Sequence, residues 1–147
     1  MKVFLASLVF LLVWIGLLGY LTHLSMRDPT MYRALALWLK DAFNLKRVKS
    51  EPFATSLNMA ILYIGYLCLG MFSVGVFKQW VKDWYFLWLN ASLLALITAI
   101  FTELIMSVIH PILISVDQIL MYAFAGLLGA ALMLFILKLV VKPTTLV

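Results

Sequence analysis

Three ionisable side chains stand seven residues apart in an otherwise apolar stretch, and they are Glu103, His110 and Asp117. The chain has only six acidic residues and two histidines, so these three are a large share of its acid–base groups. Carboxyl and imidazole groups bind polar ligands and exchange protons. Together with Asn58, they are the candidate residues for a polar site, which would bind a headgroup or handle a proton.

The sequence carries none of the compact motifs that mark a catalytic centre. It has no H-E-x-x-H, no G-x-S-x-G, no phosphate-binding loop and no Cys/His set with metal-ligand spacing. Cys68 is the single cysteine, and it is expected to pack as a small side chain within an apolar run. We therefore expect no metal, no cofactor, and no hydrolytic or redox chemistry.

Composition indicates a membrane protein. The chain is 66% hydrophobic and 12% charged, whereas soluble domains average about 45–50% and about 25%. Lipid must therefore cover much of its surface, and residues 1–147 are expected to form a single membrane domain. The net charge of +5 is modest. Basic residues beside membrane spans meet lipid headgroups, so the expected partners are membrane lipids, and no nucleic acid is expected.

Four apolar runs are long enough to cross a bilayer, at residues 3–24, 53–77, 84–109 and 114–141. A helix satisfies its own backbone hydrogen bonds in hydrocarbon, so the predicted fold is an all-α integral membrane protein with four transmembrane helices. Small residues mark candidate contact faces, because they allow helices to approach closely. They are Gly16 and Gly19 in the first run, Gly65, Gly70 and Gly75 in the second, and Ala123, Ala125, Gly126, Gly129 and Ala130 in the last. Contacts within this chain are favoured over contacts with a partner.

The segment between the first two runs is different, because it is basic and amphipathic. From about Pro29 to Arg47, the basic residues Arg33, Lys40 and Arg47 recur at helical spacing on one face. The opposite face is apolar, with Tyr32, Leu35, Leu39, Ala42 and Phe43. This pattern predicts a helix lying in the membrane interface, where Trp38 would be an anchor.

Glu103 lies about six residues, or roughly 9 Å, before the expected end of its helix. A carboxylate at that depth costs a few kcal/mol, so such a group is usually paired, protonated or in contact with water. We expect Glu103 to face the helix bundle or a polar mouth rather than lipid. Its role stays open between a structural hydrogen-bond group and part of a binding or proton-handling site.

His110 and Asp117 have local explanations as well. Ser115 and Gln118 match a capping box, in which Ser115 caps the last helix and Gln118 reaches back to the Ser115 amide. Asp117 would then lie in the first turn, where the helix dipole favours negative charge. Pro111 marks the end of the preceding helix and places His110 at a terminus that favours positive charge.

Four alternating spans would place all these polar residues at one side of the membrane. Asn58, Glu103, His110 and Asp117 could then surround one mouth, beside the basic face of Arg33, Lys40 and Arg47. Cations next to polar groups at a membrane surface suit a phospholipid or another anionic headgroup. The flanking charges favour cytoplasmic termini only weakly.

Three stretches resemble the VanZ-like membrane proteins. "TELIM" is similar to the end of one family helix, "DQILMYAFAGLLGA" to the start of the next, and "TSLNMAILYIGYLCLGMF" to a span with an early asparagine. Asn58 and Glu103 match family positions, and Asp117 does so approximately. Met106 stands at the family's glutamine, Tyr122 stands at its asparagine, and the turn lacks its arginine, which indicates a degenerate member.

This resemblance implies a protein of the bacterial inner membrane without catalytic activity. It would bind an envelope lipid, or act as an accessory subunit that packs against other integral membrane subunits. The alternative is a membrane enzyme or transporter that uses Glu103 on a lipid-linked or amphiphilic substrate.

Overall fold

The computed structural model describes residues 2–27, 30–45, 49–109 and 114–140. These residues form five α-helices and no strand: α1 (Lys2–Arg27), α2 (Thr30–Ala42), α3 (Ser50–Phe77), α4 (Trp84–Ile109) and α5 (Val116–Val140). The all-α prediction is therefore confirmed for the described part of the chain.

Three of the helices are long and apolar enough to cross a membrane, namely α3, α4 and α5. They coincide closely with the runs predicted at 53–77, 84–109 and 114–141. The remaining predicted run lies in α1, whose apolar stretch, Leu8–Leu24, is shorter. Three such helices are compatible with a multi-pass membrane protein.

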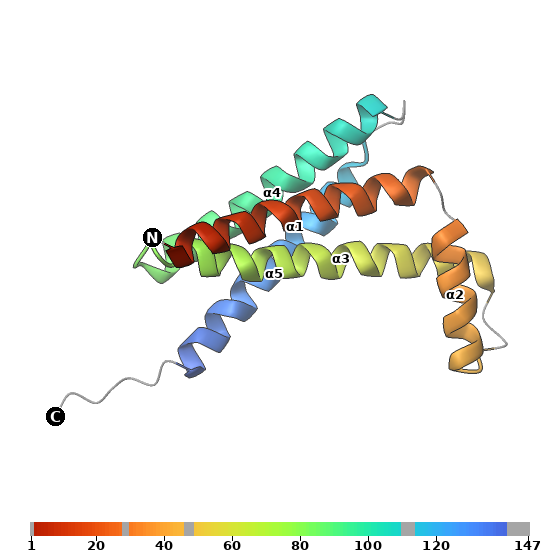
Figure 1. Ribbon diagram of the computed structural model, residues 1–147, viewed down its shortest axis with the longest axis horizontal. Coiled ribbons are helices and arrows are strands. Elements are labelled where there is room, and N and C mark those ends of the chain that lie inside the picture. The colour runs from red at the N-terminus through yellow and green to blue at the C-terminus, as the bar shows by residue number, and fades with distance from the viewer. Residues whose placement is uncertain (1, 28–29, 46–48, 110–113, 141–147) are drawn as a thin grey trace.

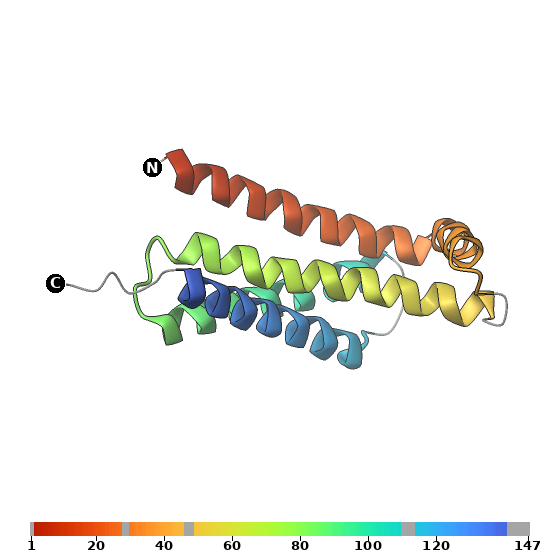
Figure 2. The same ribbon diagram turned by 90° about the horizontal axis from the view of Figure 1, so that it is seen from below.

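Helix α3 is the central element, because it packs against each of the other four helices. Helix α1 runs along α3 and touches α4 much less extensively (Figures 1 and 2). The start of α1 and the end of α5 lie at one end of the bundle, and α2 lies across the other end, nearly perpendicular to the long helices (Figure 1). That end also contains the end of α4.

Glycines bring α3 and α5 into backbone contact. A Cβ atom at Gly70 would collide with the Gly126 carbonyl, and one at Gly129 would collide with the Leu67 carbonyl. Between apolar helices in lipid, such close approach supplies dispersion contacts that the hydrophobic effect does not. The predicted contact faces are confirmed at Gly65, Gly70, Gly126 and Gly129. The prediction is wrong for Gly16, Gly19 and Gly75, because nothing lies within 4 Å of a Cβ atom at these three positions.

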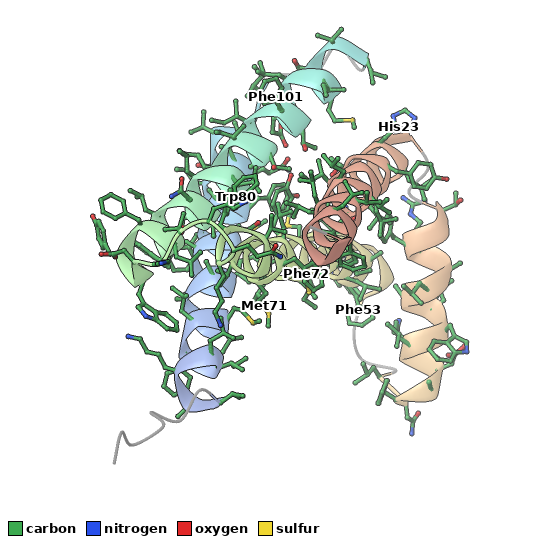
Figure 3. The ribbon with its side chains drawn as sticks, turned by 60° about the vertical axis from the view of Figure 1, so that its left-hand side comes forward. His23, Phe53, Met71, Phe72, Trp80 and Phe101 are labelled. Atoms are coloured by element: carbon green, nitrogen blue, oxygen red, sulfur yellow. The ribbon has the colours of Figure 1, made fainter. Side chains whose placement is uncertain are left out.

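Helix α1 is held on α3 by aromatic side chains. The Trp14 Nε1–H donates to the Gly65 carbonyl of α3 at 3.0 Å. Phe72 meets the Trp14 ring edge-on at a centroid distance of 5.4 Å and the Phe10 ring at 5.0 Å (Figure 3). Aromatic pairs in this geometry contribute about 0.5–1.5 kcal/mol beyond the area that they bury.

Helix α2 is shorter than predicted and uses its apolar face differently. Asn44 adopts a left-handed φ of 54°, and the Leu45 amide donates to the Lys40 carbonyl at 2.8 Å, which is a typical helix ending. Helix α2 thus ends at Ala42, before the predicted end near Arg47, and Arg47 lies outside the described residues.

The centre of the apolar face of α2 packs on the protein rather than facing lipid. Tyr32 and Ala36 are buried, and Leu39 is half-buried, whereas Leu35, Ala42 and Phe43 are exposed. On either side of the face that contacts the bundle, α2 has an exposed side, and we call these two sides its flanks. One flank of α2 carries Leu35, Trp38 and Ala42, and the other carries Arg33 and Asp41.

Cysteine scanning along α2, in a chain carrying Cys68→Ala, should show a labelling period near 3.6 residues. Positions 32 and 36 should react slowly because they pack against the protein. Arg33→Cys should react quickly. Trp38→Cys should react slowly in proteoliposomes although Trp38 is 65% exposed on the protein, because that flank would meet lipid. Uniform labelling would contradict a surface-lying helix.

Candidate functional site

The buried face of α4 determines where Glu103 points. Its buried residues recur every three or four positions: Leu87, Ala91, Ala95, Thr98, Ala99, Thr102, Glu103 and Met106. Small residues on this stripe let α3 and α5 approach α4, and Glu103 lies on the same face. Glu103 is only 4% exposed. The prediction that Glu103 faces the bundle rather than lipid is confirmed.

Glu103 links α4 to the first residue before α5. The backbone amide of Ser115 donates a hydrogen bond to the Glu103 carboxyl group. Among the described residues, the Oε1 atom of Glu103 has no hydrogen-bond partner, so Ser115 bonds the other oxygen, Oε2. The Glu103 carboxyl group thus accepts a hydrogen bond from a backbone N–H at the start of α5, where N–H groups have no partner within the helix.

The predicted capping box is therefore confirmed in one half and wrong in the other. The Gln118 amide donates to Ser115 Oγ at 3.4 Å, so Ser115 caps α5 as expected, through a long bond. The Ser115 amide, which we expected Gln118 to bind, is bonded to Glu103 instead. The spacing of the sequence suggested a local partner for the Ser115 amide, namely Gln118. In the folded chain, the partner is Glu103 from the neighbouring helix α4.

Two stacked tyrosines enclose Glu103 from α3 and α5. Tyr66 is fully buried and Tyr122 is 2% exposed, and their rings stack with centroids 4.7 Å apart and planes within 5°. The Tyr66 hydroxyl donates to Thr102 Oγ1 at 3.2 Å. The Glu103 carboxyl group interacts electrostatically with both tyrosines. We call Tyr66, Thr102, Glu103 and Tyr122 the buried polar cluster.

Helix α2 reaches this cluster through Tyr32. Tyr32 is 3% exposed, interacts electrostatically with Tyr122, and donates from its hydroxyl to the Leu21 carbonyl at 3.4 Å. Burial raises the pKa of the Tyr32 hydroxyl, so that group is neutral at pH 7. Tyr32 therefore joins α2 to α1 through its hydrogen bond, and it lies within electrostatic range of Tyr122 in the buried polar cluster.

The other predicted site residues lie in different surroundings. Asp117 is exposed in the first turn of α5, where the helix dipole favours it, so it does not share the buried environment of Glu103. Asn58 is half-buried on α3, about 12 Å of helix from Tyr66 toward the α2 end. Arg33 is exposed and Lys40 is half-buried on α2. His110 and Arg47 lie outside the described residues.

Sequence reasoning missed Tyr66 and the role of Tyr122, whereas Thr102 was among the side chains expected near Glu103. One available signal was the Ala91, Ala95 and Ala99 stripe, which continues at helical spacing to Thr102 and Glu103. A second signal was the presence of tyrosines in the middle of apolar runs, because a buried phenol needs a hydrogen-bond partner. The pairing of Tyr66 with Tyr122 had no sequence signal.

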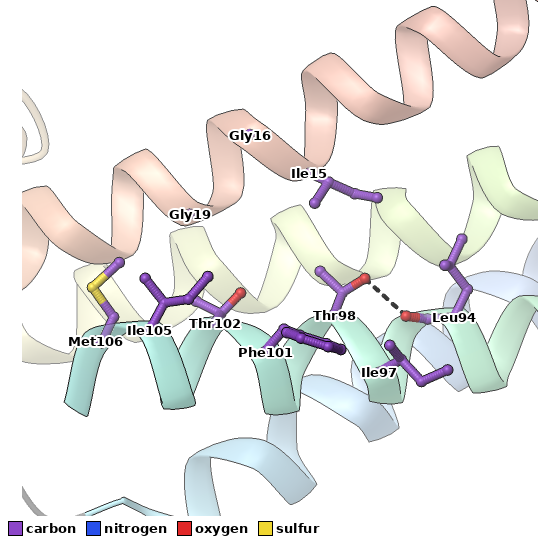
Figure 4. A pocket seen from close by; sticks show the side chains of 10 residues that line it. All are labelled: Ile15, Gly16, Gly19, Leu94, Ile97, Thr98, Phe101, Thr102, Ile105 and Met106. Carbon is purple, nitrogen blue, oxygen red and sulfur yellow. Dashed lines mark hydrogen bonds between the residues drawn. The ribbon is translucent and has the colours of Figure 1, made fainter. Parts of the chain in front are cut away.

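An apolar groove of about 440 Å³ lies between α1 and α4. Its walls are Ile15, Gly16 and Gly19 from α1, and Leu94, Ile97, Thr98, Phe101, Thr102, Ile105 and Met106 from α4, which face each other in Figure 4. The Thr98 hydroxyl turns away to the Leu94 carbonyl at 2.8 Å, so it adds little polarity (Figure 4). Thr102 lines the groove and also belongs to the buried polar cluster.

Metal ligation does not explain the cluster. Among the described residues, no group of three or more His, Cys, Asp or Glu side chains could hold a metal ion. Cys68 is a free, half-buried thiol.

Comparison of the chain with protein-family models, with curated proteins and with solved structures gives no match. The groove, the buried polar cluster and α2 are therefore the features from which a function can be inferred.

Proposed function

We propose that this chain is a four-span, non-catalytic VanZ-like protein of the bacterial inner membrane that binds an anionic envelope lipid in the groove between α1 and α4. The observation that carries the proposal is that groove, whose volume is about 440 Å³ and whose lining is almost entirely apolar. Acyl chains are the apolar ligands that a groove open to the membrane meets.

The assignment of α1 as the fourth span is supported by its length and packing. It has 26 residues, which span about 39 Å as a helix, against a hydrocarbon core of about 30 Å. It also lies alongside α3, as a neighbouring span would (Figure 2). An even number of spans agrees with the start of α1 and the end of α5 lying at one end, which we propose to be cytoplasmic.

The dimensions of the groove suit a lipid of one leaflet. Along α4 it extends from Leu94, near the middle of the helix, to Met106, near its end. The twelve helical steps from Leu94 to Met106 cover about 18 Å, close to half of a bilayer core of about 30 Å. Helix α4 ends at the end of the bundle where α2 lies (Figure 1), so the part of the groove lined by Met106 lies toward that end.

Charge at that end supports an anionic headgroup. Helix α2 carries Arg33 and Lys40 on the side opposite the apolar flank with Trp38. Basic residues near a membrane surface attract anionic lipids by about 1 kcal/mol each. The lipid would place its acyl chain between α1 and α4 and its headgroup near α2.

Lipid retention after purification tests the proposal. The double variant Gly16→Leu/Gly19→Leu should lower the lipid that native mass spectrometry detects by several-fold. A Cβ atom at either glycine has open space, so the added side chains fill the groove without a clash. Gly75→Leu is the matched control, because that Cβ position is equally open and lies outside the groove.

Headgroup selectivity is tested separately. Arg33→Gln/Lys40→Gln should abolish the preference for anionic over zwitterionic lipid, whereas Lys78→Gln/Lys82→Gln, at the opposite end, should retain it. Unchanged lipid in both sets of variants would refute lipid binding. Loss of a co-purifying membrane protein from the glycine variant, with lipid unchanged, would instead indicate the role of an accessory subunit.

A further inference from the structure

We propose that the Glu103 carboxyl group is a proton-binding site of the folded protein, enclosed by Tyr66, Thr102 and Tyr122. The ligand is a proton, which adds to the carboxylate to give a neutral carboxylic acid. The site lies inside the bundle, so the proposal does not depend on what occupies the groove between α1 and α4.

Glu103 is buried without a compensating positive charge among the described residues. Glu103 is 4% exposed on a helix that is apolar enough to span a membrane. The interactions recorded for its carboxyl group within the described part of the chain are the Ser115 amide and two tyrosines, and they include no cation. A carboxylate removed from water without a cation is far less stable than the neutral acid.

The described groups that face Glu103 come from two neighbouring helices and the residue before α5. Helix α3 presents Tyr66, α5 presents Tyr122, and the Ser115 amide lies just before α5. These are neutral groups. Within the described part of the chain, the surroundings of Glu103 therefore supply hydrogen-bonding dipoles but no positive charge that would hold the carboxylate in its ionised form.

The two oxygen atoms of the Glu103 carboxyl group have different surroundings, and this difference assigns the proton to one of them. The Ser115 N–H occupies Oε2, whereas Oε1 is buried and has no hydrogen-bond partner among the described residues. An unpaired buried O–H costs less than an unpaired buried negative charge. The proton is therefore carried on Oε1.

Infrared difference spectroscopy of the full chain in lipid bilayers tests this directly. Glu51 and Glu103 are the only two glutamates in the sequence. In Glu51→Gln protein made with carbon-13 glutamate, the sole labelled glutamate carboxyl is Glu103. We expect an isotope-shifted carboxylic-acid C=O band at pH 7, which disappears only at higher pH. A labelled carboxylate band at pH 7 would refute the proposal. This test requires no substitution of Glu103 itself.

Stability against pH gives a second readout. If the folded state binds a proton that the unfolded state has released, unfolding becomes easier as pH rises. The wild-type Tm should therefore fall as pH rises from about 5 to the pH at which the carboxylic-acid band of Glu103 disappears. Glu103→Gln should remove this fall, because the amide side chain stays neutral at every pH. Asp117→Asn is the matched control, since Asp117 is an exposed carboxyl at the same helix junction. A Tm that responds to Na⁺ at constant pH would indicate a metal cation and overturn the proton assignment.

Discussion

Replacement of Gly70 by valine should lower the free energy of unfolding by about 3 kcal/mol, the upper part of the range for overpacked interiors. The Cβ atom that valine adds at this position collides with the Gly126 carbonyl and lies close to the Ala130 amide nitrogen. A Cβ cannot rotate away and backbone atoms cannot repack, so α3 and α5 must separate. Because α3 contacts every other helix, the whole bundle loses packing.

The measurement is the unfolding transition of the purified protein in mild detergent, followed by circular dichroism during titration with a denaturing detergent. Gly75→Val is the matched control on the same helix, since nothing lies within 4 Å of a Cβ at that exposed glycine. Its effect should stay within about 0.5 kcal/mol. Equal effects of the two substitutions would show that helix propensity, rather than the α3–α5 contact, controls the result.

Replacement of Tyr66 by alanine should cost about 3–5 kcal/mol, as for other large buried aromatic side chains. The ring is fully buried, stacks on Tyr122 and lies in the main core between α3 and α5. Tyr66→Phe keeps the stack and removes only the hydrogen bond to Thr102, so its cost should be about 1 kcal/mol.

The same unfolding titration distinguishes these contributions. Tyr20→Ala is the control, because Tyr20 is 60% exposed on α1 and its loss should change stability little. If Tyr66→Phe proves as harmful as Tyr66→Ala, the hydroxyl network rather than the ring stack holds the cluster together. If Tyr20→Ala equals Tyr66→Ala, burial in the bundle is not the cause.

Much of the fold could be predicted from local pattern. The range predicted for α4, 84–109, matches the observed helix, and those predicted for α3 and α5 differ by three residues at most at each end. Apolar run length and the position of Pro111 are properties of neighbouring residues, which is why one sequence suffices to detect them. The glycine contacts of α3 and α5 follow the same logic, because small side chains in lipid are useful mainly at helix contacts.

The candidate site was only partly predictable. The cost of a buried charge indicated that Glu103 would face the bundle, and this holds. Its partners were not predictable, because Tyr66, Tyr122 and Ser115 come from three different places in the chain and meet only when α3, α4 and α5 pack. Asp117 looks similar to Glu103 in sequence, yet it is exposed.

Three properties could be predicted without the structure: the protein is helical and apolar, its long helices run where the apolar runs lie, and Glu103 avoids lipid. Each of these follows from residue chemistry and short-range spacing. Tertiary structure alone decided that Tyr32 and Ala36, rather than the whole apolar face, would pack α2 onto the bundle. It also decided that α1 would leave a groove against α4, and that the Ser115 amide would bond to Glu103. Those outcomes depend on how helices distant in sequence fit together, because hydrogen bonds and close packing are satisfied by whichever group is nearest in space.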